Sequence, residues 1–258
     1  MESFNSIAYS KLKEDMGSVN TAEHLRYCAT LPFTSLKADL RPTADGKVIL
    51  CHDAGFTLDE SGRITRYNKD DCKRILEMTE AECLALEHAQ VFDGKHCKVC
   101  DFETYIQICK ECGKKAFITV RNEDIETVAS FVLPVLEKYD YINRSIINSF
   151  TVATLEIFRR RCPQIRMSNV LPLRKVMEKA DVDTALRLGN CLLNCFHFTG
   201  SDPVGGMDIM KASAEAIAYA LEKGVAVYQA QVSENITPEE LMKYGISGAQ
   251  MFYAPTQS

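Results

Sequence analysis

The sequence predicts an α/β protein with the fold of a (β/α)8 (TIM) barrel. Two observations carry this prediction: eight short runs rich in β-branched residues recur along the chain, and helical patterns lie between them. The length of 258 residues suits a single barrel domain over residues 1–258. A doubly wound open sheet is the alternative, because periodicity alone does not show that a sheet closes.

The expected strands follow one another at regular intervals. They cover residues 5–9, 35–41, 116–121, 145–150, 165–171, 191–196, 225–231 and 247–252. One expected helix begins at Thr151, in TVATLEIFRRRC. Another has Thr237 as its N-cap, Pro238 in its first turn and Glu240 closing a capping box, and it stops before Gly245.

Residues 54–98 are too numerous for a simple loop between the second strand and the next helix. Two pieces of this stretch have helical patterns, KDDCKRILE at 69–77 and TEAECLALEH at 79–88. We therefore predict a small insertion after the second strand, lying over the mouth of the barrel.

Composition and charge exclude several classes of partner. The formal net charge is -5, and no basic cluster marks a surface for nucleic acid or for an anionic membrane. No apolar run is long enough for a signal peptide or a membrane span. Eleven cysteines without an export signal indicate reduced thiols, and so a cytoplasmic protein. The sequence does not indicate an oligomeric state.

Four of the cysteines, Cys97, Cys100, Cys109 and Cys112, form two CxxC pairs that could hold a structural zinc ion. The alternative is a helix capped by Asp101 that runs to Cys112. A rise of 1.5 Å per residue would then separate Cys100 from Cys109 by about 13 Å along the axis. Since one zinc ion does not span that distance, the helix is favoured.

A hairpin begins in the second strand, SLKADLR. Leu36, Ala38 and Leu40 share one face, whereas Lys37 and Asp39 lie on the other. Barrel strands are usually apolar on both faces, so this charged row predicts the polar end of the barrel interior. A solvated edge strand is the alternative.

The turn of this hairpin is expected at Asp45 and Gly46, which would place His52 opposite Asp39. Pro42 cannot donate to the ladder, so the register could shift there. In the strand AFITVR the same alternation turns Thr119 and Arg121 to one side. With Arg41 on the same side, the expected mouth therefore combines the His52 imidazole, one carboxylate and three cations, which suits proton transfer or anion binding.

The hairpin and several later stretches resemble the glycerophosphodiester phosphodiesterase family. The clearest match is ADLRPTADGKVILCHD, where the family has Glu-x-Asp, Thr-x-Asp-Gly and a short strand ending in His-Asp. Weaker matches are VNT, CDFETYI, INSFTVATLEIFRRRCPQIRMSNVL, KGVAVYQAQV and YGISGAQMFYAP. The resemblance implies a TIM barrel that hydrolyses glycerophosphodiesters to glycerol phosphate and an alcohol. It also implies a divalent cation, Mg²⁺ or Ca²⁺, on two glutamates and an aspartate, and two histidines that handle protons.

Much of that implied set is replaced in this chain. Tyr9 and Ser10 stand where the resemblance places the first His-Arg. Lys37 replaces the Glu of Glu-x-Asp, and Thr119 replaces the third carboxylate ligand. The chain has no Trp, so the family's Trp on the seventh strand is also missing; Tyr228 or Ala230 stands near its position.

The kept positions are Asp39, His52 with Asp53 after it, and Arg121, which retains the charge of a family lysine. A hard divalent cation needs several oxygen ligands, and an ammonium group beside Asp39 repels it. We therefore expect no metal cofactor, with Lys37 taking the electrostatic role of the cation.

The candidate catalytic residues are His52, Asp39 and Tyr9, although an unperturbed phenol is a poor acid–base group at pH 7. The candidate anion-binding residues are Lys37, Arg41 and Arg121. His197, in NCFHFTG, is a weaker candidate than these, and the glycines of TGSDPVGGMD could cradle a phosphate or simply follow a strand.

Three functions follow as hypotheses. The first is a family-like protein that binds a phosphoester or similar small anion, with hydrolysis weak, altered or lost. The second is an active phosphoric diester hydrolase that releases glycerol 3-phosphate, and the third is a structural or interaction protein. The fold alone does not decide among them.

Overall fold

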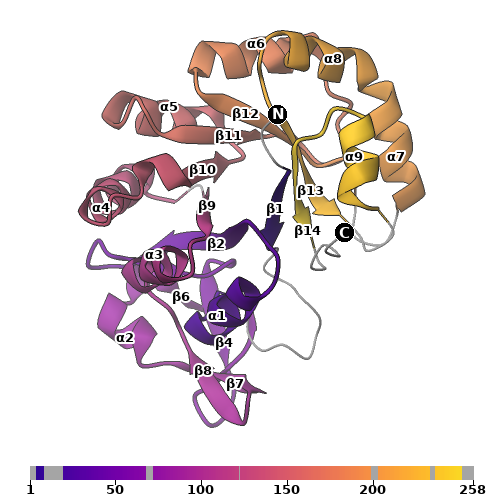
Figure 1. The fold of residues 1–258 in the computed structure, drawn as a ribbon. Helices are drawn as coiled ribbons and strands as arrows, with labels where there is room; N and C mark the ends of the chain where they lie inside the picture. The colour runs from indigo at the N-terminus through magenta and orange to yellow at the C-terminus, as the bar shows by residue number, and fades with distance from the viewer. Residues whose placement is uncertain are drawn as a thin grey trace. The chain divides into compact units, whose positions relative to one another are not determined.

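The computed structural model describes residues 4–8, 20–67, 72–121, 123–198, 203–232 and 236–251. Its larger sheet has the strand order β1-β14-β13-β12-β11-β10-β9-β2-β3, and β1 is also paired with β2. Figure 1 labels most of these strands and the helices that alternate with them along the chain. Without β3, which is antiparallel to β2, the order of the eight remaining strands returns to its start. This closed order, with helices between the strands, is that of a (β/α)8 barrel, so the predicted fold class is confirmed.

The chain divides into two compact units, of which the first comprises Met1–Leu12, Pro32–Ser35 and Ile146–Ser258. Its strands are β1 (Asn5–Ala8), β10 (Ser145–Ser149), β11 (Arg166–Val170), β12 (Cys191–Cys195), β13 (Val227–Val232) and β14 (Gly248–Met251). Its helices are α5 (Val152–Arg161), α6 (Lys179–Leu188), α7 (Pro203–Ala212), α8 (Ala214–Glu222) and α9 (Pro238–Lys243). The strand pairs from β10 to β14 are all parallel, as a barrel requires.

The second unit comprises Lys13–Leu31 and Leu36–Ser145. Its strands are β2 (Ser35–Pro42), β3 (Val48–Leu50), β4 (Gly55–Leu58), β5 (Ile64–Tyr67), β6 (Lys73–Arg74), β7 (Glu87–Phe92), β8 (Lys95–Lys98) and β9 (Lys115–Val120). Its helices are α1 (Ala22–Thr30), α2 (Glu80–Leu84), α3 (Phe102–Glu111) and α4 (Ile125–Lys138), with 3-10 turns at Ile75–Glu77 and Ile142–Arg144.

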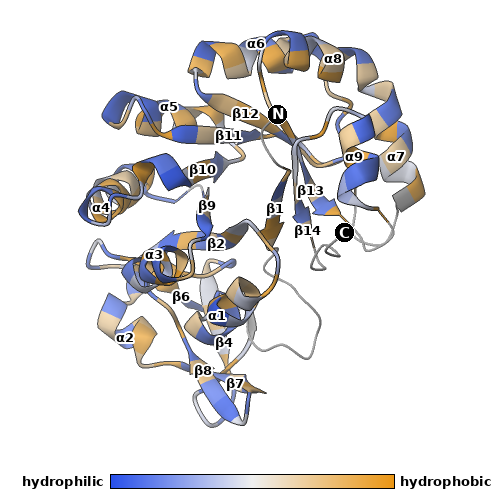
Figure 2. Ribbon diagram, viewed as in Figure 1, coloured by the Kyte–Doolittle hydropathy of each residue, from blue (hydrophilic) through white to orange (hydrophobic). Residues whose placement is uncertain are grey.

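All eight predicted barrel strands are present, with ends that differ by one or two residues; Tyr9 and Phe252 lie outside the described residues. The helix signals are confirmed as well. Thr237 caps α9 and forms a capping box with Glu240, and Asp101 caps α3. Helices such as α8 carry hydrophobic and hydrophilic residues side by side (Figure 2), and the buried residues of α8 are Ala216, Ile217 and Ala220. No helix in the described ranges is both long enough and apolar enough to cross a membrane.

The insertion at residues 54–98 is mainly a sheet, so the two helical pieces predicted there were largely wrong. Strands β4 to β8 form a separate five-stranded sheet, and only Glu80–Leu84 is α-helical. Of residues 69–77, the described part forms β6 and a 3-10 turn. Tertiary burial explains the difference, because Phe56, Ile64 and Ile75 share one small hydrophobic core. That the insertion lies over the barrel mouth, and that residues 1–258 form one domain, stay predictions.

Candidate functional site

Strand β2 carries two charged side chains into the interior of the second unit. Leu36, Ala38 and Leu40 are fully buried, as expected of the apolar face. Lys37 and Asp39 on the other face are also buried, with exposed side-chain fractions of 5% and 0%. Since β2 lies between β9 and β3 in the sheet, the alternative of a solvated edge strand was wrong.

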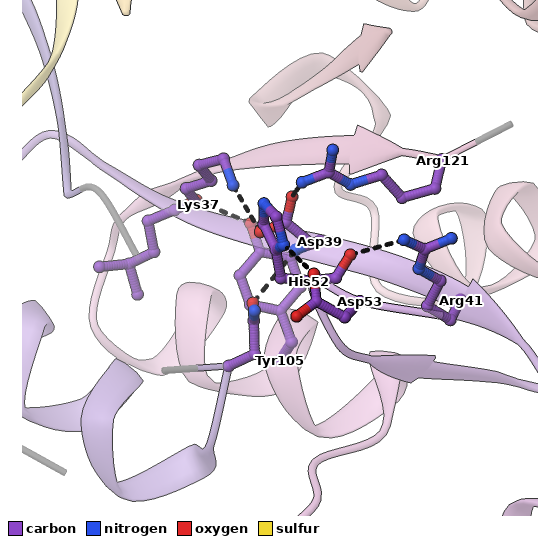
Figure 3. Close-up of polar contacts among 9 residues, drawn as sticks. Lys37, Asp39, Arg41, His52, Asp53, Tyr105 and Arg121 are labelled. Carbon is purple, nitrogen blue, oxygen red and sulfur yellow. Dashed lines mark hydrogen bonds and ion pairs between the residues drawn. The ribbon is translucent and has the colours of Figure 1, made fainter. Parts of the chain in front are cut away.

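Asp39 forms ion pairs with two cationic side chains, one at each carboxylate oxygen (Figure 3). Lys37 Nζ lies 2.5 Å from Asp39 Oδ2, and Arg121 Nη2 lies 2.6 Å from Oδ1. The backbone N–H of Asp39 donates to Asn20 Oδ1 at 3.1 Å. Arg121 comes directly after β9, so neighbouring strands β2 and β9 bring together the residues that the sequence predicted. We call Lys37, Asp39 and Arg121 the ion triad.

The charges of the ion triad stabilise one another against burial. Burial by itself raises the pKa of Asp39, but the Lys37 ammonium and the Arg121 guanidinium hold that pKa well below its usual range. Burial lowers the pKa of Lys37, and the neighbouring Asp39 carboxylate opposes the fall. The short contacts favour the charged forms of both groups, so the triad is two cations around one carboxylate.

The register of the hairpin differs by one residue from the prediction. The turn has three residues rather than two: Thr43 N donates to Lys47 O, and Gly46 adopts a left-handed φ of 72°. Leu40 therefore pairs with Leu50, and Cys51 N donates to Asp39 O at 2.9 Å. His52, expected opposite Asp39, comes one residue later, after the strand has ended.

His52 is half-exposed and is held by its neighbour in the chain. Its Nδ1 lies 2.7 Å from Asp53 Oδ1, and 44% of the His52 side chain is accessible. Burial lowers the pKa of His52, and the Asp39 carboxylate opposes this effect. The charges of the ion triad therefore act on the His52 imidazole. His52 does not, however, form the pairing with Asp39 across the hairpin that the sequence predicted.

Arg41 has a carboxylate partner that the sequence reasoning missed. Its Nη1 lies 2.7 Å from Glu123 Oε2, and its Nη2 donates to the backbone carbonyl of His52 at 2.6 Å. The sequence did offer a sign of this partner, because acidic residues follow the third barrel strand directly in the stretch RNED. The expected set of three cations and one anion is thus corrected, because Glu123 neutralises Arg41.

The residues at this position do not fit a divalent cation. Both carboxylate oxygens of Asp39 contact cationic side chains, one from Lys37 and one from Arg121. Lys37 itself stands where the sequence resemblance implies a glutamate ligand, and an ammonium group cannot bind a cation. Thr119, at the third ligand position that the resemblance implies, is 1% exposed and offers a neutral hydroxyl in place of a carboxylate. In the described ranges, no three His, Cys, Asp or Glu side chains are grouped to hold a metal ion. Hard cations need several free oxygens, and this donor set supplies too few.

Tyr9 and residues 199–202 lie outside the described residues, so the roles suggested for Tyr9 and for the first part of TGSDPVGGMD stay predictions. Gly206, in the rest of that stretch, lies in α7, where a Cβ would overlap the ring of Phe198. His197 is fully buried in the first unit, with partners Gln229 at 2.8 Å and Ser213 at 3.3 Å. Both ring nitrogens of His197 thus have partners inside the fold, and a functional role for it stays a prediction.

Most of the chain matches one known protein family. Residues 14–247 match the model of the glycerophosphoryl diester phosphodiesterase family. A search of curated proteins by sequence found no match. Among solved structures, a provisionally assigned glycerophosphoryl diester phosphodiesterase from Silicibacter pomeroyi has a TM-score of 0.77 at 18% identity, covering 98% of this chain and 90% of that one.

Two further structures are similar. A phosphodiesterase from Oleispira antarctica, in complex with the product sn-glycerol-3-phosphate, has a TM-score of 0.73 at 14% identity, covering 97% of this chain and 93% of that one. A glycerophosphodiester phosphodiesterase from Parabacteroides distasonis has a TM-score of 0.69 at 14% identity, covering 98% and 94%. At these identities the likeness shows the fold alone.

Proposed function

Because the chain belongs to the glycerophosphoryl diester phosphodiesterase family, we propose that it binds a phosphoester or similar small anion at the ion triad. In this proposal hydrolysis is weak, altered or lost. One observation carries it: Lys37 and Arg121 both contact the single carboxylate of Asp39, so the three side chains of the triad together carry one net positive charge. A buried net charge of this kind attracts an anion.

Two further features support an anion at this place. The Arg121 side chain is partly exposed, at 19%, and the planar fork of a guanidinium matches phosphate oxygens better than an ammonium does. Asn20 is 2% exposed, and its Nδ2 has no hydrogen-bond partner in the described part of the chain. Since Asn20 Oδ1 already accepts from the backbone of Asp39, Nδ2 is a donor beside the triad that a ligand oxygen could satisfy.

The altered chemistry follows from the same residues. Lys37 supplies positive charge where a metal ion would supply it, but an ammonium has no water ligand to activate. His52 is the titratable base that stays accessible, and Tyr9 stands where a second histidine is expected. An active hydrolase remains the second candidate, favoured by the exposed imidazole of His52. In both cases Arg41 acts through His52, since Glu123 already neutralises it.

The test is thermal unfolding with increasing sn-glycerol 3-phosphate or sulfate. At tenfold saturation a ligand stabilises the folded protein by about 1.4 kcal/mol, which for a chain of this size is roughly 3–5 °C in Tm. Arg121→Ala should abolish the shift. Arg26→Ala is the matched control, because Arg26 forms an exposed pair with Glu111 elsewhere in the same unit. No shift at millimolar anion in the wild type would reject the proposal and favour an interaction protein.

Metal binding is tested separately. Mg²⁺ or Ca²⁺ should leave the wild-type Tm unchanged, since Asp39 has no free oxygen to offer. The triple variant Lys37→Glu, Thr119→Glu and Tyr9→His restores the family's residue types. If it gains metal-dependent diesterase activity, the site descends from a working metal site. Micromolar metal affinity of the wild type, lost in Asp39→Ala, would show that the ligand argument is wrong.

A further inference from the structure

The His52 imidazole is fixed at Nδ1 by a carboxylate. Asp53 Oδ1 lies 2.7 Å from Nδ1, well within hydrogen-bonding distance (Figure 3). An ionised carboxylate only accepts hydrogen bonds, so the proton must lie on Nδ1. In the neutral imidazole the lone pair is then on Nε2.

The backbone of His52 is fixed as well. Arg41 Nη2 donates to the His52 carbonyl at 2.6 Å, and Arg41 Nη1 is held 2.7 Å from Glu123 Oε2. The Arg41 side chain is 11% exposed, so burial restricts its motion. His52 thus follows the end of the hairpin ladder but is tied through Arg41 to Glu123, which comes after β9.

Three buried histidines contrast with His52. His24, His88 and His197 are at most 3% exposed, and burial lowers the pKa of each to about 4. Only a small part of each ring is accessible to a ligand. His52 differs because 44% of its side chain is accessible, and in the described part of the chain Nε2 has no recorded partner.

We propose that Asp53 and Arg41 are positioning residues, which hold His52 with Nδ1 protonated and present Nε2 to the bound anion. The claim that Nε2 faces a bound anion rests on the proposed function, whereas the claim that Nδ1 is protonated in the free protein does not. When His52 is protonated, Nε2–H donates to a ligand oxygen; when it is neutral, Nε2 accepts a proton. The charged groups around the imidazole are Asp53, Asp39, Lys37, Arg121 and, through Arg41, Glu123.

The test is the ¹⁵N spectrum of the imidazoles in the uniformly labelled full chain, titrated with acid. Five histidines make assignment practical, and His52→Gln identifies the His52 resonances. In the wild type, neutral His52 should show a protonated Nδ1 and an unprotonated Nε2. His96 is an internal control, because its Nδ1 lies 2.8 Å from the His88 carbonyl and should also be protonated.

Two Asp53 variants separate charge from hydrogen bonding. Asp53→Ala removes the acceptor, so the His52 tautomers should mix. Asp53→Asn keeps an acceptor oxygen but loses the charge, so the tautomer should persist while the pKa of His52 falls further. The His96 resonances should stay unchanged in both, which also shows that the variants fold. A merely structural Asp53 would leave the tautomer unaltered, and that result would overturn the proposal.

Arg41→Lys tests the second positioning residue. Lysine keeps the charge but cannot hold Glu123 and the His52 carbonyl together as a guanidinium does. We expect roughly tenfold weaker binding of sn-glycerol 3-phosphate, and a comparable loss in Asp53→Ala, since a hydrogen bond to a charged group is lost. Unchanged affinity in both variants would overturn the positioning role. If the wild type binds no anion, the proposed function fails, yet the tautomer result still decides whether Asp53 orients His52.

Discussion

Replacing Asp39 by Asn should be the most damaging single change in the ion triad. The Lys37 side chain is only 5% exposed, and the change removes the carboxylate that lies 2.5 Å from its ammonium. Removing one partner of a buried ion pair typically costs about 3–5 kcal/mol, because the other charge stays buried and uncompensated. Whole domains are stable by only about 5–15 kcal/mol, so the effect on this protein should be large.

Lys37→Met should destabilise the protein less than Asp39→Asn does, and the difference between the two variants tests the argument. In that variant Asp39 still has Arg121 at 2.6 Å and Asn20 on its backbone N–H. The loss is then close to one charged hydrogen bond, about 2 kcal/mol. The double variant Lys37→Met with Asp39→Asn removes both charges, so it should be more stable than Asp39→Asn alone.

The assay is urea unfolding followed by far-ultraviolet circular dichroism, since the chain has no Trp to report by fluorescence. The loss of unfolding free energy in Asp39→Asn, relative to the wild type, should become smaller as pH rises from 7 towards 10. The folded protein, in which burial lowers the pKa of Lys37, releases the proton before the unfolded chain does, so stability increases with pH. A loss no larger than that of Lys37→Met, with no pH dependence, would refute the reasoning.

Two more predictions concern the rest of the molecule. The free energy of unfolding should fall as pH drops from 6.5 towards 4, because the unfolded chain binds more protons than the folded protein does. The fall should be about 2 kcal/mol at pH 5 for each buried histidine whose folded pKa is about 4. Urea unfolding at pH 7 and pH 5 measures the fall, and His197→Gln should make the free energy of unfolding depend less on pH. Gly206→Ala should destabilise the folded protein by about 1–3 kcal/mol, although alanine favours helix more than glycine does, because the new Cβ would overlap the ring of Phe198. Adding Phe198→Leu should recover part of that loss. A Tm of Gly206→Ala at or above that of the wild type would contradict the packing argument.

Local patterns determined much of the architecture. The two-residue alternation of SLKADLR and AFITVR placed Lys37, Asp39 and Arg121 on one side of neighbouring strands, and the structure joins them. Capping residues placed the starts of α3 and α9. These features depend on backbone geometry and on contacts between residues near in sequence, so they can be read without tertiary information.

The tertiary structure decided what local patterns leave open. Ala44, whose N–H donates to the distant Met78 carbonyl, joined Asp45 and Gly46 in the hairpin turn, and the longer turn moved His52 out of register with Asp39. Burial of Ile75 with Phe56 turned a helical pattern into part of a sheet core. Glu123 became the partner of Arg41, which changed the charge balance of the site. In each case the free energy depends on residues distant in sequence, so only the folded chain determines which contact is made.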